Sequence, residues 1–263
     1  MITSTDNKKI SHILKLKDKK SERVDSNGFV IEGIKLFLEA PLELCQEVFV
    51  SESLQKDTKR FSLVEEKLKQ TGYEIVKDSL FQKISDTKTP QGIVAILKRL
   101  DYSIEDLLKK ENPFVIVLEQ INDPGNLGTI LRTAEASAAA GIILTENSVD
   151  IYNPKVVRAT MGAIFRVPFI YSRNIVSIVE LLRKQPFKIY AAALENSKSY
   201  DEVNYLEACA VMIGNEANGL SKEALVLADE KIHIPMEGKG ESLNAGVAGA
   251  IIMYECARQK RTS

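Results

Sequence analysis

Residues 122–132 read NDPGNLGTILR and follow the apolar run Phe114–Leu118. Five consecutive apolar residues, rich in valine, predict a buried strand. Pro124 and Gly125 predict a sharp turn after this strand, and the spacing of the apolar residues beyond the turn predicts a helix. A strand that is joined to a helix in this way is the repeating unit of α/β proteins.

The same change from an apolar strand to small polar residues occurs twice more. Residues 213–221 read IGNEANGLS at the end of the run Ala210–Ile213, and residues 234–244 begin with IPM and end with SLN. Small residues at such turns let backbone N–H and C=O groups approach a ligand closely. Three such turns, at the ends of three separate strands, predict one site that is assembled from distant parts of the chain.

Strands and helices alternate regularly from Pro113 onward. Because the strands are apolar along nearly their whole length, the pattern predicts a parallel sheet with helices on both faces. Ligands of such sheets bind beyond the carboxyl ends of the strands, where all three turns are expected. The expected strands are 114–118, 142–145, 167–171, 188–193, 210–213 and 231–234, and the expected helices are 127–140, 154–165, 176–185, 222–228 and 243–258.

Residues 21–100 have the pattern of a separate, small α/β domain that includes an amphipathic helix over residues 61–70. The highly charged segment 101–112 is the expected linker to a second domain over residues 113–263. Residues 1–20 are the expected basic N-terminal arm, since the first 23 residues hold seven Lys or Arg and three Asp or Glu. Arg23 and its basic neighbours could neutralise phosphates of a nucleic acid, although a solvated helix face explains the same charges.

Composition and cysteine content indicate a globular protein of the cytoplasm. The 263 residues are 44% hydrophobic and 27% charged, and a net charge of −1 gives no general argument for nucleic acid. No apolar run approaches the roughly 18 residues that a membrane span needs, and the N-terminus lacks the apolar core of a secretory signal. Three widely separated cysteines predict reduced thiols, and with only two histidines beside them no metal site is expected.

Asn126, Arg132 and Glu216 are the first candidate site residues. The turn at Gly125 opens a helix whose N–H groups could receive an anion, although a plain strand-to-helix corner has the same pattern. This turn is not a G-x-G-x-x-G fingerprint, and the chain has no Walker A sequence. Arg132 follows early in the helix and can point toward the same crevice. Glu216, at the tip of an apolar strand, could cap the next helix, pair with Arg132 or remain a solvated acid.

The third turn also allows two interpretations. Ser242 could be the N-cap of the last helix or a polar ligand contact. Met236 could fill the core, or it could line a slot for an adenine ring with Asn244 as a polar contact. The last helix is rich in small residues, so another backbone or a second subunit could pack closely on it.

A fourth cluster lies in residues 153–163, where Pro154 predicts the first residue of a helix. Lys155, Arg158 and Thr160 follow on this helix and could contact a phosphate or a ribose. An ordinary surface charge is the alternative interpretation of Arg158.

Taken together, these residues resemble the SpoU, or TrmH-type, branch of the SPOUT methyltransferases, which methylate ribose 2′-hydroxyls in RNA. The resemblance runs from about Pro113 to the C-terminus, and residues 21–97 are similar to the RNA substrate-binding domain that precedes many such enzymes. The motifs of the family occur in order as Asn126-x-Gly128-x-x-x-Arg132, Gly214-Asn215-Glu216-x-x-Gly219, and Ile234-Pro235-Met236 with Ser242-Leu243-Asn244.

The resemblance implies a trefoil knot near the C-terminus, a homodimer, and S-adenosylmethionine bound in a bent form. It also implies the site residues. The implied cofactor contacts are Ala192, Gly214, Ile234, Met236, Leu243 and Asn244, and the implied catalytic residues are Arg132, Asn126, Glu216 and Ser242.

Arg132 is a poor candidate for a base, because a guanidinium with a pKa above about 12 rarely loses its proton. We therefore hypothesise that Arg132 stabilises the developing alkoxide and holds the adjacent phosphate. In this hypothesis Glu216 orients Arg132, while Asn126 and Ser242 hydrogen-bond the ribose.

Ribosomal RNA is the expected substrate, because a separate reader domain suits a large structured target, and tRNA is the alternative. The alternatives are a Rossmann-type nucleotide enzyme and a non-catalytic RNA-binding module. A Rossmann-type nucleotide enzyme requires a glycine fingerprint that the first turn lacks. A non-catalytic RNA-binding module would have no affinity for S-adenosylmethionine.

Overall fold

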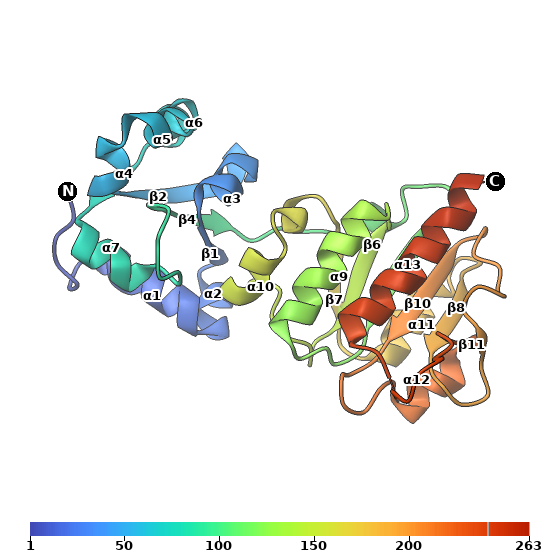
Figure 1. The fold of residues 1–263 in the computed structure, drawn as a ribbon. Helices are drawn as coiled ribbons and strands as arrows, with labels where there is room; N and C mark the ends of the chain where they lie inside the picture. The colour runs from blue at the N-terminus through green and yellow to red at the C-terminus, as the bar shows by residue number, and fades with distance from the viewer. Residues whose placement is uncertain (241, 263) are drawn as a thin grey trace. The chain divides into compact units, whose positions relative to one another are not determined.

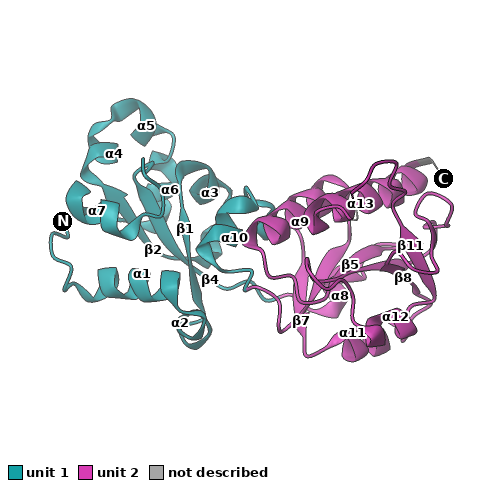
Figure 2. Cartoon of the chain, turned by 60° about the horizontal axis from the view of Figure 1, so that its bottom comes forward, with its two compact units in different colours: residues 1–101, 150–165 teal, residues 102–149, 166–263 magenta. Residues whose placement is uncertain are grey.

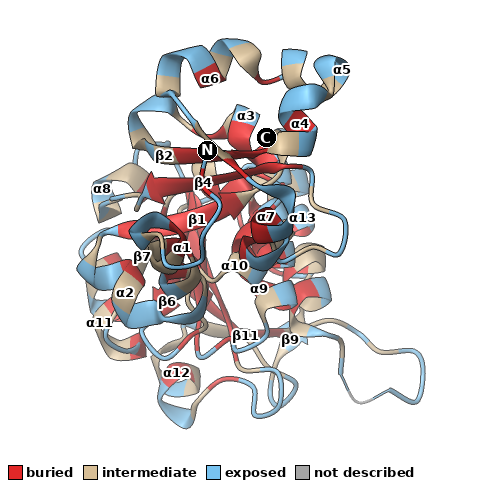
Figure 3. Ribbon diagram, turned by 90° about the vertical axis from the view of Figure 1, so that its left-hand side faces the viewer, coloured by how far each residue is buried: buried red, intermediate tan, exposed pale blue. Residues whose placement is uncertain are grey.

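The structure is a computed structural model that describes residues 1–240 and 242–262. Contacts divide it into two compact units, the first made of Met1–Asp101 with Asp150–Phe165 and the second of Tyr102–Val149 with Arg166–Ser263 (Figure 2). Figure 1 labels the helices and strands. Buried residues concentrate on the strands and on the helix faces that contact them (Figure 3). Among the described residues, no helix combines the length and apolar character that a membrane crossing needs.

The second unit contains the predicted parallel sheet, which is confirmed. Its seven strands have the order β7-β6-β5-β10-β8-β11-β9, and every neighbouring pair is parallel. The strands are β5 (Phe114–Leu118), β6 (Gly141–Thr145), β7 (Phe169–Ser172), β8 (Lys188–Ala192), β9 (Lys198–Ser199), β10 (Cys209–Ile213) and β11 (Glu230–His233). Each residue of β5, β6 and β10 is buried, as expected for strands covered on both faces.

Helices cover both faces of this sheet. The helices are α8 (Ile104–Leu107), α9 (Pro124–Ala136), α11 (Ile175–Leu182), α12 (Lys222–Leu227) and α13 (Ala245–Thr262). Figure 2 shows α9 and α13 on one side of the sheet and α11 and α12 on the other. Gly246 and Gly249 let α13 approach closely, because a Cβ at Gly249 would meet the Ile213 side chain at 2.9 Å and one at Gly246 would meet Thr129 at 3.3 Å.

The first unit is built on a four-stranded sheet of order β1-β4-β2-β3, in which only β2 and β3 are parallel. The strands are β1 (Gly28–Glu32), β2 (Cys45–Ser51), β3 (Glu74–Val76) and β4 (Ile93–Lys98). The helices are α1 (Lys8–Asp18), α2 (Lys20–Asp25), α3 (Ile34–Glu39), α4 (Glu52–Lys56), α5 (Thr58–Ser62), α6 (Glu65–Thr71), α7 (Asp78–Ile84) and α10 (Pro154–Ala159), with 3-10 turns at Leu42–Leu44 and Ala163–Phe165.

Several predicted segments differ in detail from the structure. The expected helix over residues 154–165 consists of α10 and the separate 3-10 turn at Ala163–Phe165. The expected helix over residues 61–70 is divided between α5 and α6, and Gly72 ends α6 with a φ of +69°. The expected linker 101–112 contains the short helix α8, where Ser103 and Asp106 form a capping box.

The N-terminal residues are not a separate arm. Helix α1 directs Ile10, Ile13 and Leu16 into the core of the first unit, and each of these side chains is fully buried. Lys8, Lys9 and Lys15 are exposed on the same amphipathic helix, whereas Lys17 is largely buried and pairs with Asp86. The solvated helix face, which was the alternative interpretation of the basic charges, therefore describes this segment better than an extended arm.

Residues 150–165 belong to the first unit although they follow β6 of the second unit in sequence. The Arg23 Nε donates to Asp150 Oδ2 at 2.7 Å, and both side chains are at least nine-tenths buried. The ring of Tyr152 packs on Phe29 with a centroid distance of 4.7 Å, and its hydroxyl donates to the Leu100 carbonyl oxygen. The first unit thus takes part of its core from a segment that the sequence pattern assigns to the second domain.

Arg23 and Thr160 are internal residues, which corrects their prediction as RNA contacts. Arg23 is 3% exposed and donates to the Leu16 and Lys17 carbonyl oxygens as well as to Asp150. Thr160 is 1% exposed, and its hydroxyl donates to the Val157 carbonyl oxygen. Both side chains are engaged inside the first unit, so neither is placed to meet a phosphate.

We predict that Asp150→Ala destabilises the protein, because it leaves the Arg23 guanidinium buried without its counter-ion. Removal of one partner from a buried ion pair costs about 3 kcal/mol or more. Urea denaturation measures the change in the free energy of unfolding. Glu65→Ala is the control, because it breaks the exposed pair with Lys69 and should have a much smaller effect. Equal losses in the two variants would contradict the role of the buried pair.

Candidate functional site

The three sequence motifs meet at one edge of the sheet in the second unit. All neighbouring strands are parallel, so their carboxyl ends lie at the same edge. Strand β10 lies between β5 and β8, and Ile213 is opposite Leu118 in the register. The turns after β5 and β10 are therefore neighbours, although some 90 residues separate them in sequence.

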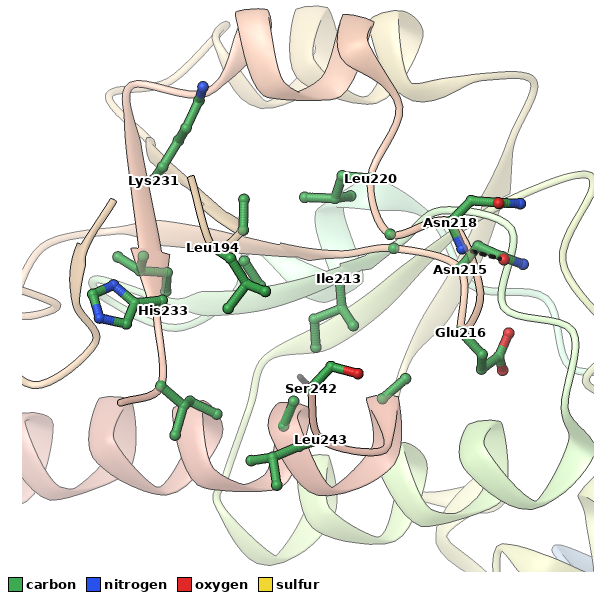
Figure 4. A pocket seen from close by; sticks show the side chains of 18 of the residues that line it. Leu194, Ile213, Asn215, Glu216, Asn218, Leu220, Lys231, His233, Ser242 and Leu243 are labelled. Atoms are coloured by element: carbon green, nitrogen blue, oxygen red, sulfur yellow. Dashed lines mark hydrogen bonds between the residues drawn. The ribbon is translucent and has the colours of Figure 1, made fainter. Parts of the chain in front are cut away.

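A cavity of about 470 Å³ opens at this edge. Its walls come from the ends of β8, β10 and β11 and from the start of α13. Figure 4 shows Leu194, Ile213 and Leu243 near the middle of the cavity, with Glu216 toward one end and His233 toward the other. Of the predicted cofactor contacts, those that line the cavity are Ala192, Gly214, Ile234, Met236 and Leu243, and the predicted catalytic residues Glu216 and Ser242 line it as well.

Loop 214–221 forms a large part of the cavity wall and is tightly folded. The backbones of Asn215 and Gly219 exchange two hydrogen bonds of 3.0 and 2.9 Å, which close the loop on itself. The Asn215 side chain accepts from the N–H groups of Ala217 and Asn218. Gly214 faces the returning chain so closely that an added Cβ would lie 2.1 Å from the Gly219 carbonyl carbon. Only glycine fits at this position.

Glu216 holds the turn that follows β5. Its Oε1 accepts from the Asp123 N–H and the Asn126 Nδ2, both at 3.0 Å, and its Oε2 accepts from the Asn122 N–H at 3.2 Å. Burial raises the pKa of this carboxyl, but the hydrogen bonds from Asn126 and from the backbone outweigh burial, and the pKa is lowered. The hydrogen bonds from the turn thus stabilise the ionised form of the Glu216 carboxylate.

Asn126 connects all three motifs. It is 7% exposed, its Nδ2 donates to Glu216, and its Oδ1 accepts from the Asn244 Nδ2 at 2.8 Å. The Asn244 Oδ1 accepts from the N–H groups of Gly246 and Val247 at the start of α13. Asn244 therefore begins the last helix, the role that Ser242 could have had, and it lies beside the cavity without lining it.

Arg132 is exposed on α9, about two helical turns after Asn126. Across the part of the chain that the structure describes, its side chain makes no hydrogen bond or ion pair, and it does not line the cavity. The oxygens of Glu216 are occupied by the turn after β5 instead. The hypothesis that Glu216 orients Arg132 directly is therefore replaced by a role for Glu216 in holding Asn126.

Lys155 and Arg158 lie on α10 in the first unit. Lys155 is exposed, and Arg158 is partly exposed with its Nη1 3.8 Å from Asp86 Oδ2. Both cations reach the surface, in contrast to Arg23 and Thr160.

Sequence reasoning missed Glu119, which follows β5 and is 5% exposed. Its two carboxylate oxygens accept from the N–H and the hydroxyl of Ser221, both at 2.8 Å. The signal was present, because an acid at the end of an apolar strand is the same pattern that identified Glu216.

Comparison with known proteins agrees with this geometry. The family model described as the SpoU rRNA Methylase family matches residues 113–254, and the model of an MRM3-like substrate binding domain matches residues 7–95. The chain belongs to the SpoU rRNA methylase family. The resemblance stated from the motifs is thereby confirmed, and so is the presence of a substrate-binding domain ahead of the SpoU methylase domain.

Similar proteins span nearly the whole chain. The 23S rRNA (guanosine(2553)-2′-O)-methyltransferase RlmP of Bacillus subtilis is 34% identical over 96% of this chain and 97% of its own length. The crystal structure of an AdoMet-bound rRNA methyltransferase from Sinorhizobium meliloti is 28% identical, with a TM-score of 0.84 over 98% of this chain and 97% of that chain. The SpoU methyltransferase AviRb from Streptomyces viridochromogenes, at 23% identity and a TM-score of 0.86, shares the fold over 98% of this chain and 100% of that chain.

We predict that Gly214→Ala lowers the stability of the protein and distorts the cavity, because the new methyl group would overlap the backbone at Gly219. Overpacking of this kind costs about 1–3 kcal/mol. Thermal unfolding measures the loss. Gly238→Ala is the matched control, since nothing lies within 4 Å of a Cβ there and its effect should be small. A Gly214→Ala protein as stable as the control would show that the loop is not closely packed.

Proposed function

We propose that this chain transfers a methyl group from S-adenosylmethionine to a ribose 2′-hydroxyl in RNA, with large-subunit rRNA as the substrate. The observation that carries the proposal is the cavity at the carboxyl ends of β8, β10 and β11, lined by the second and third SpoU motifs and bordered by the first. Family membership and the rRNA methyltransferases that cover the whole chain support the same reaction.

The cavity fits the cofactor. Its volume of about 470 Å³ lies within the range of roughly 300–1,000 Å³ that small-molecule sites occupy. The walls combine apolar side chains, such as Leu220 and Leu243, with the backbone of loop 214–221, which offers polar groups to an adenine ring or a carboxylate. S-Adenosylmethionine supplies an electrophilic methyl group on a sulfonium, and Ala192, Gly214, Ile234, Met236 and Leu243 would hold the molecule.

Arg132 is the residue proposed to act on the RNA. A ribose hydroxyl is a poor nucleophile, and negative charge grows on its oxygen as its proton leaves. A guanidinium, with a pKa above about 12, is suited to stabilise that charge and to hold the adjacent phosphate. The exposed position of Arg132 on α9 is consistent with contact to a large substrate.

Asn126 and Ser242 are proposed to position the ribose. The Asn126 amide has two N–H groups, of which Glu216 accepts one. Among the described residues no acceptor takes the second N–H, which is therefore assigned to a ribose oxygen. Ser242 is exposed at the cavity wall, so its hydroxyl can reach a substrate beside the cofactor. In this arrangement Glu216 acts by holding Asn126, and positioning contributes much of the rate.

The first unit is proposed to bind the RNA. Its match to a substrate-binding domain supports this division of labour, with methyl transfer assigned to the second unit. Lys155 and Arg158, which reach the surface of the first unit, are the proposed phosphate contacts. A separate domain for recognition suits a large folded RNA, which favours rRNA over tRNA.

Methyl transfer tests the proposal. We predict that the protein transfers labelled methyl from S-adenosylmethionine to large rRNA that lacks the modification, and that alkali releases the label as a ribose-methylated dinucleotide. Arg132→Ala should lower turnover by at least about a hundredfold, a loss typical of a charge-stabilising group, while the cofactor Kd stays nearly unchanged. Scintillation counting of size-fractionated RNA measures turnover, and calorimetry measures binding.

The other outcomes of the methyl-transfer experiment would each contradict one part of the proposal. Label confined to tRNA would support methyl transfer to ribose but would contradict rRNA as the substrate. Cofactor binding without label on any RNA would contradict the proposed acceptor, and absence of cofactor binding would favour a non-catalytic RNA-binding protein. Loss of cofactor binding in a folded Arg132→Ala protein would contradict the role assigned to Arg132.

We further propose that the protein is a cytoplasmic homodimer whose C-terminal region carries a trefoil knot. An exposed apolar strip on α13 supports the dimer, since Val247 and Tyr254 are 46% and 51% exposed and one heptad apart. A second copy would remove this strip from water.

We predict that sedimentation equilibrium gives a mass near twice the chain mass of 29.2 kDa. Tyr254→Asp should shift the protein toward the monomer, because it would bury a charge in the proposed interface. Val226→Asp is the control, since Val226 is 84% exposed on α12 and lies outside the strip. A monomeric wild-type protein would exclude the dimer.

A further inference from the structure

Glu119 is a buried carboxylate that the proposed reaction does not use. It is 5% exposed at the end of β5, does not line the cavity, and binds both the N–H and the hydroxyl of Ser221. A buried carboxylate is costly unless hydrogen bonds compensate it, and here a single residue supplies both of the bonds that the structure shows.

Glu119 holds both ends of the cavity loop. Its own N–H donates to the Ile213 carbonyl oxygen at 2.9 Å, directly before the loop begins, and its carboxylate binds Ser221, where the loop ends. Every residue from Gly214 to Leu220 lines the cavity. Together with the Asn215–Gly219 backbone bonds, one residue outside the cavity therefore fixes the two ends of this wall.

Glu119 and Glu216 make reciprocal contacts. Glu119, on the turn after β5, binds the end of the loop, whereas Glu216, on the loop, binds the turn at Asn122, Asp123 and Asn126. Between them, the Asn215 Nδ2 donates to the Gln120 carbonyl oxygen at 2.9 Å. Glu119 contacts the loop at Ser221, whereas Glu216 contacts the turn at Asn126, so the two carboxylates act at different points of the site.

We propose that Glu119 is a positioning residue for the cofactor site. It holds the Ser221 end of loop 214–221 and thereby sets the affinity for S-adenosylmethionine, while the Asn126 side of the site depends on Glu216. This inference rests on the proposed function, because that function assigns the cavity to S-adenosylmethionine.

The test compares cofactor binding and turnover in full-length variants. Glu119→Ala removes both acceptors of Ser221, and the loss of hydrogen bonds to a charged group should raise the cofactor Kd at least about tenfold. Glu119→Gln keeps the shape and one acceptor for the Ser221 N–H, so it should restore the Kd to within about threefold of wild type. At saturating cofactor, kcat of Glu119→Ala should stay within about threefold of wild type, because Glu216 still holds Asn126.

A matched control separates positioning from general stability. Glu255 is another buried carboxylate of the second unit, 9% exposed, which accepts from Arg258 and Gln259 and does not line the cavity. Glu255→Ala should lower the melting temperature but leave the cofactor Kd unchanged. If Glu119 acts through Ser221, the effects of Glu119→Ala and Ser221→Ala on the Kd should be non-additive in the double variant.

The outcomes distinguish this inference from the proposed function. A wild-type protein that does not bind S-adenosylmethionine would overturn both. If wild type binds and Glu119→Ala keeps its Kd within about twofold, or if Glu255→Ala weakens binding equally, Glu119 is a stability residue and the inference is wrong. A fall in kcat with no change in Kd would also overturn it, and calorimetry with steady-state kinetics separates these cases.

Discussion

The parallel pairing of β5 with β10 is the contact on which the site depends. In this pairing Leu118 lies opposite Ile213, so the two buried strands end side by side. The backbone must turn after each strand, and the N–H groups beyond the last hydrogen bonds of the sheet need other acceptors. Glu119, in the turn after β5, accepts from the Ser221 N–H at the end of loop 214–221. Glu216, in that loop, accepts from the Asp123 N–H in the turn after β5. The same hydrogen bonds that complete the fold therefore shape the cavity wall.

The third motif joins this arrangement through Asn126. Its amide lies between Glu216 and Asn244, so hydrogen bonds connect the start of α13 to the turn after β5. Packing reinforces the connection, since Gly249 lets α13 lie against Ile213 and Ile130. Residues from three distant segments are thus held by both polar and apolar contacts, as expected for a site that must keep its geometry while ligands exchange.

Local patterns in the sequence are sufficient for six of the seven strands of the second unit, for the parallel sheet and for the meeting of the three motifs, because apolar runs and turn residues act over a few positions. The two-residue strand β9 is too short to leave such a pattern. Partners far apart in sequence were not predictable in the same way. Arg23 has the pattern of a surface cation, yet Asp150 lies 127 residues later and neutralises it in the core. Likewise, Glu216 could be recognised as a candidate, but its pairing with Asn126 instead of Arg132 follows from the register of β5 and β10.

Arg132 differs physically from the other motif residues. Asn126, Glu216 and Asn244 are each held by hydrogen bonds within the second unit, whereas the described residues offer Arg132 no polar partner. A solvated arginine retains about 2 kcal/mol of side-chain rotamer entropy, so its orientation must be set by whatever binds it. An RNA phosphate, or an acidic group of a second subunit, would provide that restraint. The protein thus holds Asn126, Glu216 and Asn244 in advance and leaves Arg132 to be ordered by whatever binds it.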